Sequence, residues 1–144
     1  MLPDIPKNLV VDAGYWYALF DPRDALSRDA QAKAHHIESL RVMLPWPTLY
    51  ETLRTRFVKN RTGMDRFERI LKRWNVTYVD DKPYREQALA ATIDKARTGT
   101  RAISLCDMLI RLLIEDPNLR IRALLTLNVR DFQDVCRIKD VQIL

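Results

Sequence analysis

Five short apolar runs alternate along the chain with longer segments that carry an apolar stripe. The runs lie at residues 8–12, 41–44, 76–79, 121–126 and 141–144. The first of them, Asn8-Leu-Val-Val, does not alternate between apolar and polar positions, which is typical of a strand that is covered on both faces. We therefore expect five short strands in a sheet that lies between helices.

The segments between these runs have the spacing of helices. We predict helices at residues 14–20, 24–40, 48–60, 64–74 and 104–115, a further helix that is capped by Asp80 or Asp81 and runs to about residue 97, and a short helical turn at 129–133. Leu49, Leu53 and Phe57 form the apolar stripe of the third helix, and Trp74 ends the stripe of the fourth. Residues 104–115 are apolar nearly all round, so this helix should be buried.

Strands that alternate with helices predict a three-layer α/β/α sandwich around a central, mostly parallel five-stranded sheet. Ligands of such sheets bind beyond the carboxyl ends of the strands, where the strand order reverses. The length of 144 residues suits one domain over residues 1–144.

The composition is typical of a soluble globular protein, with 47% apolar and 30% charged residues. The most apolar stretch, residues 108–114, is too short to span a membrane and is interrupted by Arg111. Residues 1–8 lack the basic start and the apolar run of a signal peptide. The two cysteines are too few for a disulfide framework, so we expect a cytoplasmic protein with free thiols.

The net charge of +5 is concentrated in one part of the chain. Residues 54–73 carry Arg54, Arg56, Lys59, Arg61, Arg66, Arg69, Lys72 and Arg73 against only Asp65 and Glu68. A run of charges is usually a solvated helix face, but this excess of one sign is equally compatible with a surface for a phosphate backbone. The first four cations of the run are our candidate RNA contacts.

Three stretches share one form, a small polar residue followed three positions later by an acid. They are Thr48-Leu-Tyr-Glu51, Ser104-Leu-Cys-Asp107 and Asn128-Val-Arg-Asp131. Each one alone is best explained as a helix cap, in which the polar side chain accepts a bond from the first turn and the acid bonds back.

Together with Asp12, the three acids suggest a second explanation. Asp12 ends the first strand, and helices of a parallel α/β sheet begin near the carboxyl ends of its strands, so all four carboxylates should approach one edge. Such a cluster is repulsive, and a hard divalent cation with oxygen ligands, Mg²⁺ or Mn²⁺, relieves the repulsion. A site of this kind can activate water and cleave a phosphodiester.

The ordered motifs Val10-Val-Asp12, Thr48-x-x-Glu51, Ser104-x-x-Asp107 and Leu125-Thr-Leu-Asn128-Val-Arg-Asp131-Phe132 resemble the signature of PIN domains, and most closely the VapC-type ribonuclease toxins of toxin–antitoxin pairs. The resemblance covers essentially the whole chain. It implies RNA cleavage that depends on Mg²⁺ or Mn²⁺, a homodimer and an inhibitory antitoxin.

On this resemblance, Asp12, Glu51 and Asp107 match the three core acids of the family. Either Asp131 or Asn128 fills the fourth position; we put forward Asp131 as the acid and Asn128 as a supporting ligand, with Thr126 and Ser104 as polar residues that line the site. A fold of this type kept only for binding RNA or protein is the alternative, and a phosphoacceptor signalling domain is a weaker one, because Asp12 has no acidic neighbour.

Overall fold

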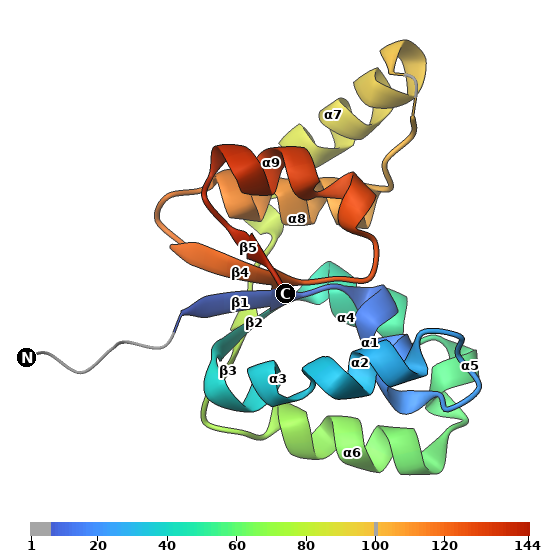
Figure 1. The fold of residues 1–144 in the computed structure, drawn as a ribbon. Helices are drawn as coiled ribbons and strands as arrows, with labels where there is room; N and C mark the ends of the chain where they lie inside the picture. The colour runs from blue at the N-terminus through green and yellow to red at the C-terminus, as the bar shows by residue number, and fades with distance from the viewer. Residues whose placement is uncertain (1–6, 100) are drawn as a thin grey trace, which may run out of the picture.

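Five parallel strands form a single sheet in the computed structural model, which describes residues 7–99 and 101–144 (Figure 1). Residues 1–6, where we predict no signal peptide, and Thr100 lie outside the described residues. The strands are β1 (Asn8–Val11), β2 (Arg41–Pro45), β3 (Val76–Val79), β4 (Ile121–Leu125) and β5 (Gln142–Ile143). Each neighbouring pair is parallel, so the predicted sheet is confirmed.

The strand order is β3-β2-β1-β4-β5. From β1 the chain builds outwards through β2 and β3, and it then returns to the other side of β1 with β4. The order therefore reverses between β1 and β4, and the crevice beyond the ends of these two strands is where ligands of doubly wound sheets bind.

Helices cover both faces of the sheet (Figure 1). One layer contains α1 (Ala13–Phe20), α2 (Ser27–Lys33), α3 (His35–Ser39), α4 (Trp46–Thr52), α5 (Thr55–Val58) and α6 (Arg61–Leu71). The opposite layer contains α7 (Arg85–Thr98), α8 (Leu105–Glu115) and α9 (Gln133–Ile138), with the 3₁₀ turns η1 (Lys82–Tyr84) and η2 (Val129–Asp131). This is the predicted three-layer sandwich, and no helix in the described part of the chain is long and apolar enough to cross a membrane.

Two predicted helices are wrong as single elements. The segment 24–40 is divided, because Asp24 forms a capped turn with Leu26 and Ser27, and the chain tightens around Ala34 before α3. The segment 48–60 begins earlier, at Trp46, and breaks after Thr52 into α4 and α5.

The fourth predicted helix is shifted towards the N-terminus. It spans Arg61–Leu71, so Trp74 lies beyond its end and is 85% exposed instead of completing the apolar stripe. Near the C-terminus, the predicted turn at 129–133 leads into a helix, α9, whose six residues are too few to show a helical pattern in the sequence.

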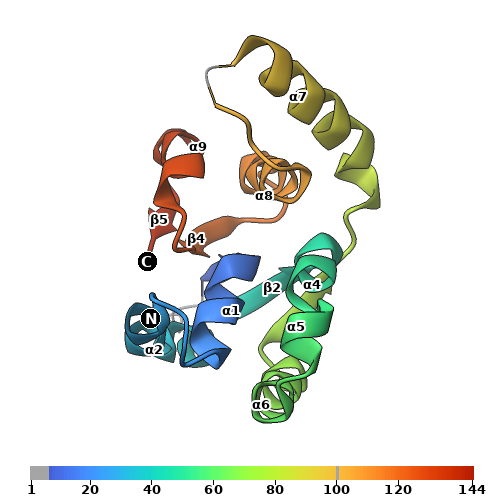
Figure 2. The ribbon, with the colours of Figure 1, turned by 90° about the vertical axis from the view of Figure 1, so that its right-hand side faces the viewer.

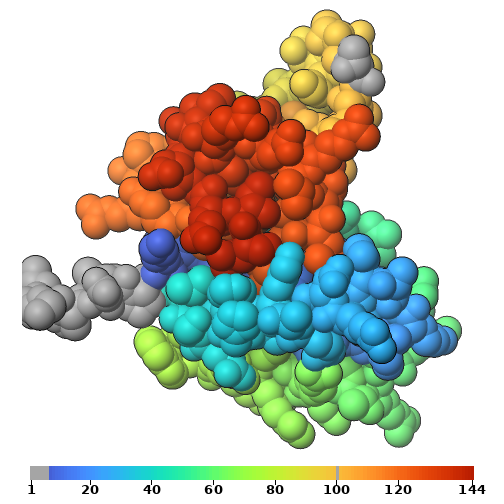
Figure 3. Space-filling view, in the orientation of Figure 1, coloured from blue at the N-terminus to red at the C-terminus, as the bar shows by residue number. Residues whose placement is uncertain are grey.

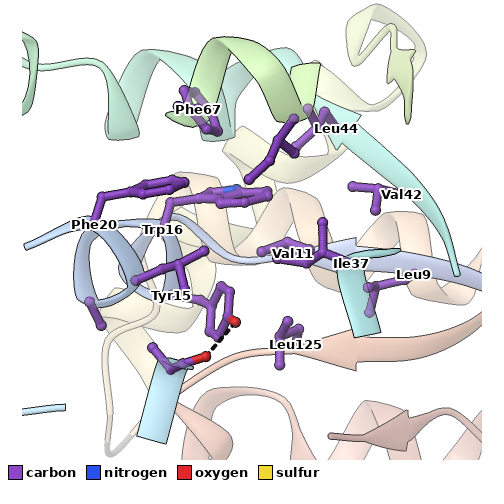
Figure 4. Close-up of a cluster of buried hydrophobic side chains, with 14 of the residues drawn as sticks. Leu9, Val11, Tyr15, Trp16, Phe20, Ile37, Val42, Leu44, Phe67 and Leu125 are labelled. Carbon is purple, nitrogen blue, oxygen red and sulfur yellow. Dashed lines mark hydrogen bonds between the residues drawn. The ribbon is translucent and has the colours of Figure 1, made fainter. Parts of the chain in front are cut away.

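An aromatic core fixes the position of α1 against the sheet (Figure 4). Trp16 stacks on Phe20 with parallel rings 6.1 Å apart, and its indole meets the edge of Phe67 at 5.0 Å. Tyr15 is fully buried, and its hydroxyl donates to the carbonyl of Ala30 in α2 at 2.7 Å. Because α1 begins directly after Asp12, this packing also fixes the site at the end of β1.

One helix of the second layer, α7, projects from the rest of the molecule. Helix α7 extends beyond the rest of the second layer, as Figures 2 and 3 both show. Only Ala88 of this helix is buried, and its Leu89 and Ile93 are exposed. The helix ends at Gly99 as predicted, and a side chain at that position would lie 2.6 Å from the Lys95 carbonyl, which explains the glycine.

Candidate active site

Three of the predicted acids line one cavity at the edge of the sheet where β1 ends and α1 begins, the edge that faces the viewer in Figure 2. Asp12 follows β1, Glu51 lies in α4, and Asp107 lies in the first turn of α8. The cavity has a volume of about 550 Å³, and Asn128 also lines it. Residues that are far apart in the sequence therefore meet at the strand-order reversal.

Asp12 lies at the ends of the adjacent strands β1 and β4, where hydrogen bonds hold its carboxylate. Its side chain is 6% exposed; one carboxylate oxygen accepts the backbone N–H of Ala13 at 2.8 Å and the other accepts the Thr126 hydroxyl at 2.9 Å. Thr126 follows β4 and is fully buried, and its oxygen also accepts the backbone N–H of Asn128 at 3.0 Å. The predicted supporting residue Thr126 thus orients Asp12 from the opposite side of the crevice.

Capping explains only one of the three motifs. Ser104 is the N-cap of α8, and its hydroxyl oxygen accepts the backbone N–H of Asp107 at 3.1 Å. Thr48 does not cap α4, which begins two residues earlier after Pro45; its buried hydroxyl has no hydrogen-bond partner among the described residues. Asn128 precedes η2 without a side-chain cap. Repeated helix capping therefore does not account for the pattern.

The carboxylates of the cavity interact electrostatically. Burial raises the pKa of Asp12, and the nearby charges of Glu51 and Asp131 raise it further, while the bonds from Thr126 and Ala13 oppose the rise. Burial, followed by the charges of Asp12, Glu51 and Asp131, raises the pKa of Asp107 to about 7. Ionisation of either acid is therefore unfavourable, because each is partly desolvated and lies near other carboxylates.

The two candidates for the fourth position, Asn128 and Asp131, lie in different surroundings. Asn128 lines the cavity, whereas Asp131 is not among the described lining residues, although its charge acts on Asp12 and Asp107. The Asp131 carboxylate is bound by the guanidinium of Arg101 and by the side-chain amide of Asn128. Asp131 is therefore paired with Arg101 and Asn128 in this conformation, outside the described lining of the cavity.

The described residues contain no group of three or more His, Cys, Asp or Glu side chains placed closely enough to hold a metal ion. The acids surround one cavity, but their oxygens do not converge on a point. Oxygen donors of Asp12, Glu51, Asp107 and Asn128 are the kind that Mg²⁺ and Mn²⁺ prefer. The donor set therefore fits such an ion in its chemistry, and ligation would require the side chains to move closer together.

The candidate RNA contacts are only partly gathered at the site. Arg54 and Arg56 line the acid cavity, while Lys59 and Arg61 are not among its described lining residues. Arg56 pairs with Asp21 at 3.5 Å. Arg54 makes no ion pair within residues 7–99 and 101–144, so its charge is available to a ligand.

Several residues of the site were not predicted as such. Tyr17 lines the cavity and donates its hydroxyl to the Glu51 carbonyl at 3.1 Å; its position one turn after Ala13 is a signal that could have identified it. Asp21 and Asp24 also line the cavity. Arg101 could not be found from the sequence, because nothing near it indicates that it reaches Asp131.

No protein-family model matches the sequence, and no curated protein matches it.

Proposed function

We propose that this protein is a divalent-metal-dependent endoribonuclease that hydrolyses RNA phosphodiester bonds, and that it is the toxin of a toxin–antitoxin pair of the PIN-domain, VapC-like type. The single observation that carries the proposal is the meeting of Asp12, Glu51 and Asp107 in one cavity at the strand-order reversal. Two further features support it: the raised pKa of Asp107, and Arg54, which lines the cavity and makes no ion pair with another described residue.

Asp12, Glu51 and Asp107, with Asn128 as a neutral oxygen donor, would hold Mg²⁺ or Mn²⁺. The ion would supply Lewis acidity to water and to the departing oxygen. The two hydrogen bonds that Asp12 accepts fix the orientation of this potential metal ligand before an ion binds. A cation would also lower the pKa of Asp107, because it favours the ionised carboxylate that burial and the neighbouring acids disfavour.

Arg54 would bind an RNA phosphate next to the cleaved bond, since it lines the acid cavity and a guanidinium presents its donors in a fixed plane. Asp131 would remain outside the set of ligands for as long as Arg101 and Asn128 hold it. Its charge still contributes to the negative potential of the cavity.

A non-catalytic RNA- or protein-binding module is the second candidate. One observation favours it: no group of three or more potential ligands in the described part of the chain is assembled for a metal. Under this alternative the cavity would still bind a cationic or phosphate-bearing partner, but a divalent ion would have no measurable effect on the protein.

The test combines cleavage with metal binding. Single-stranded RNA is incubated with the protein and Mn²⁺ or Mg²⁺, and Asp12→Asn is compared with Asp65→Asn, which changes an exposed acid on α6. We expect cleavage by the wild type and by Asp65→Asn only, and a calorimetric Mn²⁺ signal that Asp12→Asn loses. Equal cleavage by both variants would refute the assignment, and RNA binding with no metal signal would favour the module.

The proposal extends to partners and location. It includes a protein antitoxin that occupies the cavity, a homodimer and a cytoplasmic location. The exposed Leu89 and Ile93 on the projecting helix α7 are compatible with a contact to another chain. Sedimentation of the purified protein would test the dimer directly.

A further inference from the structure

A second cavity, with a volume of about 430 Å³, adjoins the acid cavity. The two share Glu51 and Arg54 in their walls, so a ligand at the acid site has direct access to both. The floor and sides of the second cavity are largely apolar: Pro47, Ala88, Leu105 and Leu109 line it. Its polar lining groups include Ser104 and the ion pair of Asp81 with Arg85.

An aromatic surface continues outwards from this cavity. Tyr50, which lines the cavity, is 75% exposed, and its ring lies 6.4 Å from that of Trp46. Trp46 in turn stacks on Tyr78 of β3, with ring centres 5.3 Å apart and an angle of 19° between the planes. Trp46 and Tyr78 are also exposed, at 43% and 45%. Three large aromatic rings are thus presented to solvent in one row beside the candidate site.

Exposed aromatic rings beside a free arginine are the two parts of a single-strand nucleic acid site. Bases stack on aromatic faces, and cations bind the backbone that joins them. Arg54 supplies the cation between the two cavities. The Arg85 guanidinium is held by both oxygens of Asp81, at 2.7 and 3.1 Å, so it contributes a planar surface with little free charge.

We propose that the second cavity, with the ring of Tyr50 at its mouth, binds an unstacked nucleobase of the RNA strand whose phosphate lies in the acid cavity. Trp46 and Tyr78 extend this surface to the next base. The inference rests on the proposed nuclease function and deepens it. It assigns the substrate as unpaired RNA, because a base within a duplex cannot leave its stack without breaking its pair.

Binding without cleavage tests the subsite separately from catalysis. The affinity of a labelled single-stranded oligoribonucleotide and of a duplex of the same sequence is measured by fluorescence anisotropy in EDTA. Tyr50→Ala is compared with Tyr50→Phe, which keeps the ring, and with Trp74→Ala, which removes a ring that is 85% exposed just before β3 begins, at the opposite edge of the sheet.

We expect Tyr50→Ala to weaken single-strand binding roughly tenfold, the order of loss when a base loses its aromatic partner. Tyr50→Phe and Trp74→Ala should remain within about twofold of the wild type, and duplex affinity should not change with any of the three. A 2-aminopurine base in the strand should be quenched by the wild type and not by Tyr50→Ala.

Two results would overturn the subsite. One is unchanged single-strand binding by Tyr50→Ala, which would leave the aromatic row as a surface for a protein partner; the other is an equal loss for strand and duplex. The nuclease proposal fails on a different result, cleavage that survives Asp12→Asn. In a cleavage assay, Tyr50→Ala should raise KM and leave kcat nearly unchanged, because the ring binds the substrate before and during reaction alike.

Discussion

Replacing Asp107 by asparagine should stabilise the protein at neutral and alkaline pH. Burial and three neighbouring acids raise the pKa of this carboxyl to about 7 from 3.8. The folded state therefore holds a proton that the unfolded chain has lost between these two pH values, and stability falls as pH rises through this interval. Asparagine has nearly the same shape and never ionises. The Ser104 cap is kept, because it binds the backbone N–H of residue 107.

The size of the effect follows from the shift. A carboxyl whose pKa rises from 3.8 to about 7 costs the folded state about 4 kcal/mol at pH 8 if the whole shift acts on stability. Asp107 is only half-buried, and solvent screening reduces such a figure, so we expect about 2 kcal/mol. For a domain of this size, this corresponds to a Tm higher by roughly 6 °C.

The assay is urea unfolding of wild type and Asp107→Asn between pH 5 and pH 8 without metal. The free-energy difference between the two should grow with pH. His36, whose lowered pKa gives a slope of opposite sign, remains in both proteins and cancels in the difference. Asp12, whose pKa is also raised, is coupled to Asp107 through its charge, so the difference measures Asp107 together with this coupling. Mn²⁺ at pH 8 should stabilise the wild type more than the variant. A pH-independent difference, or a variant less stable at pH 8, would refute the reasoning.

Three further substitutions test single contacts. Thr126→Val should destabilise the protein by about 1–3 kcal/mol in urea unfolding, because it removes the hydroxyl that donates to buried Asp12. Ser104→Ala should cost about 1 kcal/mol as the loss of an N-cap, while calorimetric Mn²⁺ binding persists. Arg54→Gln should weaken RNA binding and reduce its salt dependence by about one counterion, whereas Arg69→Gln, on α6 away from the cavity, should change neither substantially.

The strands and the sheet could be predicted because their signals are local. Runs such as Leu9 to Val11 are apolar throughout, and all three of these side chains are fully buried. Helix limits depended on first-turn and capping features that the apolar pattern does not show. Helix α4 begins two residues before Thr48, with Pro47 in its first turn, where a proline is tolerated. Asn60 caps α6 by accepting the backbone N–H of Gly63, which places the start of that helix earlier and leaves Trp74 beyond its end.

The site was predictable to the extent that topology determines it. Asp12 follows β1, Glu51 lies in α4, the helix that follows β2, and Asp107 lies in the first turn of α8. The carboxyl ends of parallel strands share one edge, and the three acids line the cavity there. The ion pair of Asp131 with Arg101 could not be predicted. Arg101 reaches Asp131 from the loop before α8, and the sequence spacing contains no sign of that pairing.

The directions of the pKa shifts set Asp12 and Asp107 apart from the other described acids with a shifted pKa, including Asp21, which lines the same cavity but is bonded to Arg23. Among described carboxylates with a shifted pKa, five have it lowered by bonded partners: Asp21, Glu68, Asp81, Asp116 and Asp134. Asp12 and Asp107 have it raised, and they line one cavity. An acid kept for stability alone would gain a cationic partner or be replaced by a neutral residue. Two acids that lower stability side by side are therefore best explained by a ligand that their charge serves.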